Sequence, residues 1–140
     1  MVGGKFSMVP YRIVLADHHA LLRQGVRRIL RERPDMEVIG EAEDGVELFD
    51  LLNSGKLIPQ MVILDLSMPN LRGTEAIHKV KAMRPDVKVL VLSLHKDKEY
   101  LNQAISHGAE GYLLKEDVDK ELLPAIELIR KGNVYVSPFP

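Results

Sequence analysis

Four polar residues follow apolar stretches of the chain, and together their side chains could handle a phosphoryl group. They are Asp17, Asp65, Ser93 and Lys115. A carboxylate such as Asp65 can attack phosphorus and hold the phosphoryl group as a mixed anhydride. Asp17 can bind Mg²⁺ directly or through water, because this hard cation favours oxygen ligands. Lys115 offers a positive charge to phosphate oxygens and Ser93 a hydroxyl hydrogen bond, which supplies the charge neutralisation and positioning that phosphoryl transfer requires.

The stretches that precede these residues predict β-strands. Met61–Leu64 is apolar at every position, which is typical of a strand covered on both faces. Four further strands are expected over Ile13–Ala16, Glu37–Ala42, Val87–Leu92 and Gly111–Leu114. Between strands, and after the last one, apolar residues recur at three- and four-residue spacing, which predicts helices. The last helix is expected over about Lys120–Lys131, with Pro124 forcing a late start or a slight bend.

Strands that alternate with helices favour parallel βαβ units with right-handed crossovers. We therefore expect one α/β domain, a doubly wound sheet of five strands flanked by five helices. Ligands bind such sheets at the carboxyl ends of the strands, where the four polar residues would converge. Taken singly, each residue has an ordinary interpretation as a turn cap, a loop hydroxyl or a surface lysine. Their coincidence at four strand ends favours a site.

Composition excludes several other classes of function. The chain of 140 residues has a net charge of −1 and no cysteine, so disulfides and thiolate metal sites are ruled out. A nucleic-acid-binding domain would normally show a basic excess. The arginines between Arg23 and Arg33 alternate with apolar residues at helical spacing, and we interpret them as a solvated helix face. No apolar run is long enough to span a membrane, and we expect a cytoplasmic protein.

Four segments together resemble bacterial response-regulator receivers, specifically the subfamily with a C-terminal LuxR/NarL-type helix-turn-helix. They are Val14–Gly25, Leu64–Pro69 with Gly73, Val91–His95 and Gly108–Lys115. The resemblance covers about Tyr11 to Pro138 and implies the flavodoxin-like receiver fold, with strand order 2-1-3-4-5. The receiver domain would then occupy residues 11–132. Residues 1–10 would be a flexible lead-in, and residues 133–140 would begin a linker toward an effector domain absent from this sequence.

The resemblance also implies a chemical role for several residues. Asp65 would take a phosphoryl group from a phosphohistidine on a sensor kinase, with Mg²⁺ bound by Asp17, Asp65 and the backbone carbonyl of Ser67. Ser93 and Tyr112 occupy the positions of the family's hydroxyl and aromatic switch pair. Lys115 takes the position of the family's phosphoryl-contacting lysine.

Such a protein is a signalling switch rather than an enzyme, apart from self-catalysed phosphotransfer and dephosphorylation. The resemblance implies a sensor histidine kinase as partner, a homodimer on phosphorylation, and DNA contact only through the absent helix-turn-helix. Ser67 and His95 lie two residues past Asp65 and Ser93, where the family tunes dephosphorylation. An ordinary loop histidine remains the alternative for His95, as does a plain half-buried aromatic for Tyr112.

The sequence departs from the family at His18, which stands where the second acid of the first-strand pair is usual. Imidazole is a poor ligand for Mg²⁺, so we expect weak Mg²⁺ binding, with His18 beside the metal or facing solvent; nitrogen ligation would favour Mn²⁺ or Zn²⁺ instead. Because of this departure, a protein-interaction module that works without phosphorylation remains the alternative function. A flavodoxin-like or nucleotide-binding enzyme is disfavoured, because no glycine-rich phosphate loop follows the first strand.

Overall fold

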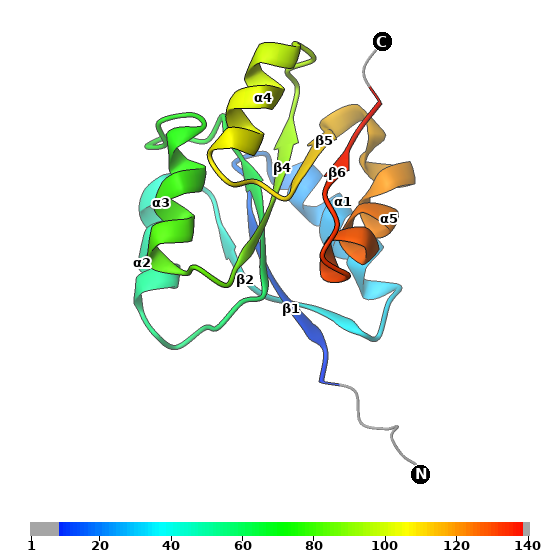
Figure 1. Cartoon of the computed structure of the whole chain (residues 1–140). Coiled ribbons are helices and arrows are strands. Elements are labelled where there is room, and N and C mark those ends of the chain that lie inside the picture. The colour runs from blue at the N-terminus through cyan, green and yellow to red at the C-terminus, as the bar shows by residue number, and fades with distance from the viewer. Residues whose placement is uncertain (1–8, 139–140) are drawn as a thin grey trace.

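A six-stranded parallel sheet forms the centre of the molecule, in the order β2-β1-β3-β4-β5-β6 (Figure 1). The computed structural model describes residues 9–138, and the expected flexible lead-in lies largely outside them. The strands are β1 (Tyr11–Ala16), β2 (Met36–Ala42), β3 (Met61–Asp65), β4 (Lys88–Ser93), β5 (Gly111–Leu114) and β6 (Tyr135–Val136). The helices are α1 (Ala20–Arg31), α2 (Gly45–Asn53), α3 (Glu75–Met83), α4 (Lys98–Ser106), a 3₁₀ turn (Lys115–Asp117) and α5 (Val118–Arg130).

Helices cover both faces of the sheet, as the alternating pattern predicts. Helices α2, α3 and α4 lie on one face, and α1 and α5 lie on the other (Figure 1). Alternate residues of β3 are buried in the two separate cores: Val62 and Leu64 in the first, Met61 and Ile63 in the second. This explains why every position of that strand is apolar, since neither face reaches water.

The expectation of five strands is wrong by one. Tyr135 and Val136, which fall in the segment expected to begin a linker, pair in parallel with Gly111 and Tyr112 of β5. The pairing is extended by a hydrogen bond from the Ser137 N–H to the Tyr112 carbonyl at 2.9 Å. Two residues are too few to produce a hydrophobic period, so the sequence pattern gave no sign of this strand.

Pro124 does not delay the last helix. Helix α5 begins at Val118, two residues before the expected start, and runs through Pro124 without interruption. Proline removes the N–H that would bond the carbonyl of Lys120. Both Lys120 and Pro124 are exposed, so water can satisfy that carbonyl and the cost of a proline at this position is reduced. Within residues 9–138, none of the helices combines the length and the apolar character that crossing a bilayer demands.

The register of the sheet brings the four strand ends together. Ala16 pairs with Leu64, Asp65 with Leu92, and Ser93 with Leu114. Because parallel strands place their carboxyl ends at one edge, the residues just beyond these pairs meet there. The sheet therefore gathers Asp17, Asp65, Ser93 and Lys115 as the sequence predicts.

Candidate functional site

Asp65 is the centre of the site, at the end of the central strand β3. Its side chain is 1% exposed, and one carboxylate oxygen, Oδ1, accepts two hydrogen bonds from Ser67. The backbone N–H of Ser67 donates at 2.9 Å and its hydroxyl at 2.7 Å. This local turn is favoured because an aspartate readily bonds the backbone two residues ahead. The carboxylate is thus held in one orientation, with Oδ2 facing the rest of the site.

Lys115 joins the two carboxylates. Its ammonium nitrogen lies 3.2 Å from Oδ2 of Asp65 and 3.3 Å from Oδ2 of Asp17, and all three side chains are at most 6% exposed. Burial acts to raise the pKa of Asp65, but the Ser67 hydrogen bonds and the Lys115 charge together lower it below its ordinary value. The carboxylate is therefore ionised at neutral pH, which is the form that a nucleophile requires.

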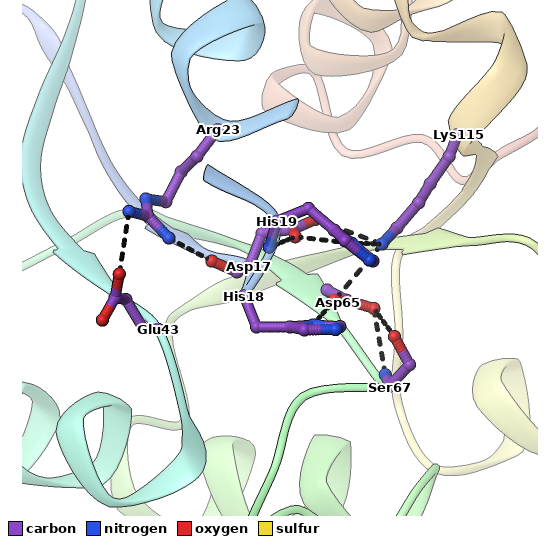
Figure 2. A network of polar contacts seen from close by, with 8 residues as sticks. All are labelled: Asp17, His18, His19, Arg23, Glu43, Asp65, Ser67 and Lys115. Carbon is purple, nitrogen blue, oxygen red and sulfur yellow. Dashed lines mark hydrogen bonds and ion pairs between the residues drawn. The ribbon is translucent and has the colours of Figure 1, made fainter. Parts of the chain in front are cut away.

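Two histidines close the site on its solvent side (Figure 2). Nδ1 of His18 lies 2.9 Å from Oδ2 of Asp65, so the ring is turned toward the carboxylate although 32% of it is exposed. The backbone N–H of His19 donates to Oδ1 of Asp17 at 2.7 Å, and its Nδ1 lies 3.1 Å from the Lys115 nitrogen. The sequence pattern predicts no role for His19, and the contacts of its ring with Lys115 and Asp17 are seen only in the structure.

Arg23 was misinterpreted from the sequence. Its side chain is only 14% exposed, and Nη1 donates to the backbone carbonyl of Asp17 at 2.5 Å. The same guanidinium pairs with Glu41 at 3.0 Å and with Glu43 at 3.3 Å, which fixes the exit of β1 (Figure 2 shows the contact to Glu43). Its spacing in the sequence could have indicated this contact. Arg23 lies one helical turn after His19, and this position directs its side chain back toward the end of β1.

A small cavity opens beside Asp65. Its volume is about 60 Å³, and it is lined by Asp65, Leu66, Ser67, Ser93, Leu94, His95 and Tyr100. The hydroxyl of Ser93 accepts a hydrogen bond from the His95 N–H at 2.9 Å. The ring of His95 stacks on Tyr100, with centroids 4.2 Å apart. Both residues expected to tune dephosphorylation, Ser67 and His95, thus border the space next to Asp65.

Tyr112 is fully buried and contacts two of the residues that line this cavity. Its hydroxyl donates to the backbone carbonyl of His95 at 2.9 Å, and its ring meets Tyr100 edge to face at 6.4 Å. Burial raises the pKa of Tyr112, although a hydrogen bond with Ser93 opposes the effect. The expected aromatic partner of Ser93 is therefore in contact with both the hydroxyl residue and the loop that follows β4.

Four side chains could hold a metal ion at this edge: Asp17, His18, His19 and Asp65. Their ligand atoms lie within 4.8 Å of one another. Oδ2 of Asp17 is buried and makes no hydrogen bond with any residue from 9 to 138, so it is open to a cation beside the Lys115 charge. Two carboxylates fit a divalent cation, whereas the imidazoles fit Mg²⁺ poorly because it prefers six oxygen ligands. The donor set is accordingly mixed.

The geometry agrees with a known family. A model of the response regulator receiver domain matches residues 13–127, which is most of the chain. The chain belongs to the response regulator receiver family. Members of this family are signalling domains of two-component systems, so the family predicted from the four sequence segments is confirmed.

Relatives of this receiver domain are similar over nearly its whole length. The transcriptional regulatory protein DegU of Brevibacillus brevis is 40% identical over 127 residues, which cover 91% of this chain and 53% of DegU. The oxygen regulatory protein NreC of Staphylococcus carnosus is 39% identical over 128 residues, covering 91% of this chain and 58% of NreC. The chain thus spans just over half the length of these relatives.

A solved structure supports the same assignment. The two-component response regulator of the LuxR family from an Aurantimonas species superposes with a TM-score of 0.84 and 32% identity. The alignment covers 93% of this chain and 91% of that one. The receiver fold and the LuxR-type subfamily predicted from the sequence are confirmed.

Proposed function

We propose that this receiver domain is a phosphorylation switch whose acceptor is Asp65. One observation carries the proposal: the buried Asp65 carboxylate is oriented by Ser67 and paired with Lys115 at the carboxyl edge of the sheet. A buried carboxylate held in this way is arranged for nucleophilic attack. The donor would be a phosphohistidine of a sensor histidine kinase, and a receiver serving such a kinase would work in the cytoplasm.

In the proposed reaction, the phosphoryl group passes directly from the phosphohistidine to Asp65. A carboxylate oxygen of Asp65 forms the new P–O bond as the P–N bond of the phosphohistidine breaks, and the departing imidazole nitrogen takes a proton from solvent water. A divalent cation bound at Asp17, Asp65 and the Ser67 carbonyl would neutralise charge on the phosphoryl oxygens. For Mg²⁺ this binding should be weak, because His18 replaces an oxygen ligand. Lys115 would contribute a further positive charge next to both carboxylates.

Phosphorylation would change the balance of forces at the site. It adds a charge of about −1.5 to −2 and three acceptor oxygens next to Lys115 and Ser93. Movement of Ser93 toward those oxygens breaks its hydrogen bond with the His95 N–H. The same loop is tied to Tyr112 through the His95 carbonyl, so the change would reach the face formed by α4, β5 and α5. We propose that this face is the output surface of the switch.

The lifetime of the phosphorylated state would depend on access of water to phosphorus. Ser67 and His95 border the cavity beside Asp65, and the stacked rings of His95 and Tyr100 belong to residues that line it. We propose that Ser67 and His95 tune the rate of self-catalysed dephosphorylation. Downstream, we propose homodimer formation and regulation of transcription through a C-terminal helix-turn-helix, in keeping with the name of the DegU relative.

The experiment is phosphorylation of the purified domain with acetyl phosphate, with and without Mg²⁺, followed by intact-mass measurement. We expect a single phosphoryl adduct that vanishes in Asp65→Asn and persists in Asp86→Asn, a matched exposed carboxylate. A second candidate, a phosphorylation-independent interaction module, is favoured only by His18. A folded protein that forms no adduct with acetyl phosphate or with a sensor kinase would support that module and overturn the switch.

A further inference from the structure

The side chains at the carboxyl edge include nitrogen ligands as well as oxygen ligands. Asp17 and Asp65 are buried at 0% and 1% exposure, whereas His18 and His19 are 32% and 49% exposed. Each buried carboxylate is in contact with one partly exposed imidazole. A cation bound between them would be shielded by the carboxylates and reached from solvent past the imidazoles. His18 stands where the resemblance to the receiver family implies an acid, so its imidazole changes the donor set at this edge.

The separations of these atoms match those between neighbouring metal ligands. Nδ1 of His18 lies 2.9 Å from Oδ2 of Asp65, and Nδ1 of His19 lies 3.3 Å from Oδ1 of Asp17. Nitrogen and oxygen ligands at about 2.0–2.2 Å from Zn²⁺ stand roughly 3.0–3.4 Å apart at octahedral to tetrahedral angles. All four ligand atoms lie within 4.8 Å of one another.

A second observation points independently to a missing positive charge. Among the described residues, Oδ2 of Asp17 is buried without a hydrogen bond, and the Lys115 ammonium lies 3.3 Å from it. The same ammonium also serves Asp65 at 3.2 Å. One buried positive charge therefore faces two buried carboxylates, and an uncompensated buried charge is costly. A divalent cation beside Lys115 would remove the deficit.

We propose that this site binds a divalent cation of the first transition row, such as Mn²⁺, Co²⁺, Ni²⁺ or Zn²⁺, in preference to Mg²⁺. Asp17, Asp65 and His18 are the ligands, and His19 is a fourth. Imidazole suits the first-row transition metals, whose affinity for nitrogen and oxygen sites rises from Mn²⁺ toward Ni²⁺. Mg²⁺ demands oxygen ligands in strict octahedral geometry, which the imidazole of His18 disrupts. Cation binding needs no phosphoryl group, so this inference stands apart from the switch.

The test is titration calorimetry of the metal-free domain with MgCl₂, MnCl₂ and ZnCl₂ in separate runs. We expect one site per chain, and at least about tenfold tighter binding of Mn²⁺ and Zn²⁺ than of Mg²⁺. Changes even in groups that support metal ligands shift affinity by about 10–100-fold. His18→Asp should therefore weaken Zn²⁺ by at least tenfold and strengthen Mg²⁺. His78→Ala, which removes an exposed imidazole from α3, is the control and should change neither affinity.

Co²⁺ absorption provides a readout that does not depend on the heat of binding. Bound Co²⁺ should give ligand-field bands that change in His18→Ala and stay unaltered in His78→Ala. The proposal is overturned if Mg²⁺ binds as tightly as Zn²⁺ and Mn²⁺. It is also overturned if folded His18→Ala keeps the Zn²⁺ affinity, or if His78→Ala abolishes it. Phosphorylation of Asp65 can succeed or fail without altering these outcomes.

Discussion

The hydroxyl of Ser137 accepts a hydrogen bond from the backbone N–H of Leu114 at 3.0 Å, in the interior of the protein. Leu114 is the residue before Lys115, and Ser137 is 1% exposed. The same hydroxyl donates to Glu121 of α5 at 3.2 Å. The segment after α5 is therefore anchored directly behind the lysine of the candidate site.

Replacement of Ser137 by alanine should destabilise the domain. The Leu114 N–H would lose its acceptor while it remains buried, which costs about 1–3 kcal/mol of unfolding free energy. Urea unfolding followed by circular dichroism measures the change. Ser106→Ala removes an exposed hydroxyl that bonds only a local helical carbonyl, and should change the unfolding free energy far less. Equal effects of the two variants would show that the Ser137 anchor is unimportant.

Two glycines at helical positions should respond to alanine with opposite sign. A Cβ on Gly45 would lie 2.3 Å from the carbonyl oxygen of Asn70, so the start of α2 and the loop after β3 would have to separate. We expect Gly45→Ala to cost about 1–3 kcal/mol, as overpacking commonly does. A Cβ on Gly25 meets nothing within 4 Å. Gly25→Ala should stabilise α1 by about 0.5–1 kcal/mol, and thermal unfolding of both variants tests the contrast.

Removal of the Tyr112 hydroxyl should loosen the loop after β4. Tyr112→Phe keeps the buried ring but loses the hydrogen bond to the His95 carbonyl, at a cost of about 0.5–1.5 kcal/mol. Amide hydrogen exchange should quicken in the residues around His95 and stay unchanged in α1, on the opposite face of the sheet. Unchanged exchange of the loop would mean that the hydroxyl does not restrain it.

The sheet and the meeting of four polar residues were predictable because both depend on local patterns. Apolar runs defined the strands, and parallel strands must share one carboxyl edge. The contacts of Arg23 and His19 were not predictable, since they depend on how α1 returns over the end of β1. The strand Tyr135–Val136 was missed for a related reason: its pairing with β5 is tertiary, and two residues show no period.

The ion-pair cluster around Asp35 should make stability depend on acid pH. Arg33 donates two hydrogen bonds of 2.9 Å to Asp35 and Arg130 donates one of 2.8 Å, which joins the ends of α1 and α5. The Arg33 hydrogen bonds, followed by that of Arg130, lower the pKa of Asp35 from 3.8 to about 2. Because the folded-state pKa is depressed, the stabilisation is complete above pH ~4 and is lost as the pH falls toward about 2.

Asp35→Asn should therefore cost stability only where the carboxylate is charged. At pH 6 we expect a loss of about 1 kcal/mol, a value reduced for solvent screening of these partly exposed partners. The difference from the unaltered protein should shrink steadily below pH 4, as urea unfolding at a series of pH values would measure. Asp86→Asn, at an exposed turn before β4, should show no such trend. Because asparagine has nearly the same shape as protonated aspartate, a pH-independent cost of Asp35→Asn would contradict the assignment of this stabilisation to the ionised carboxylate.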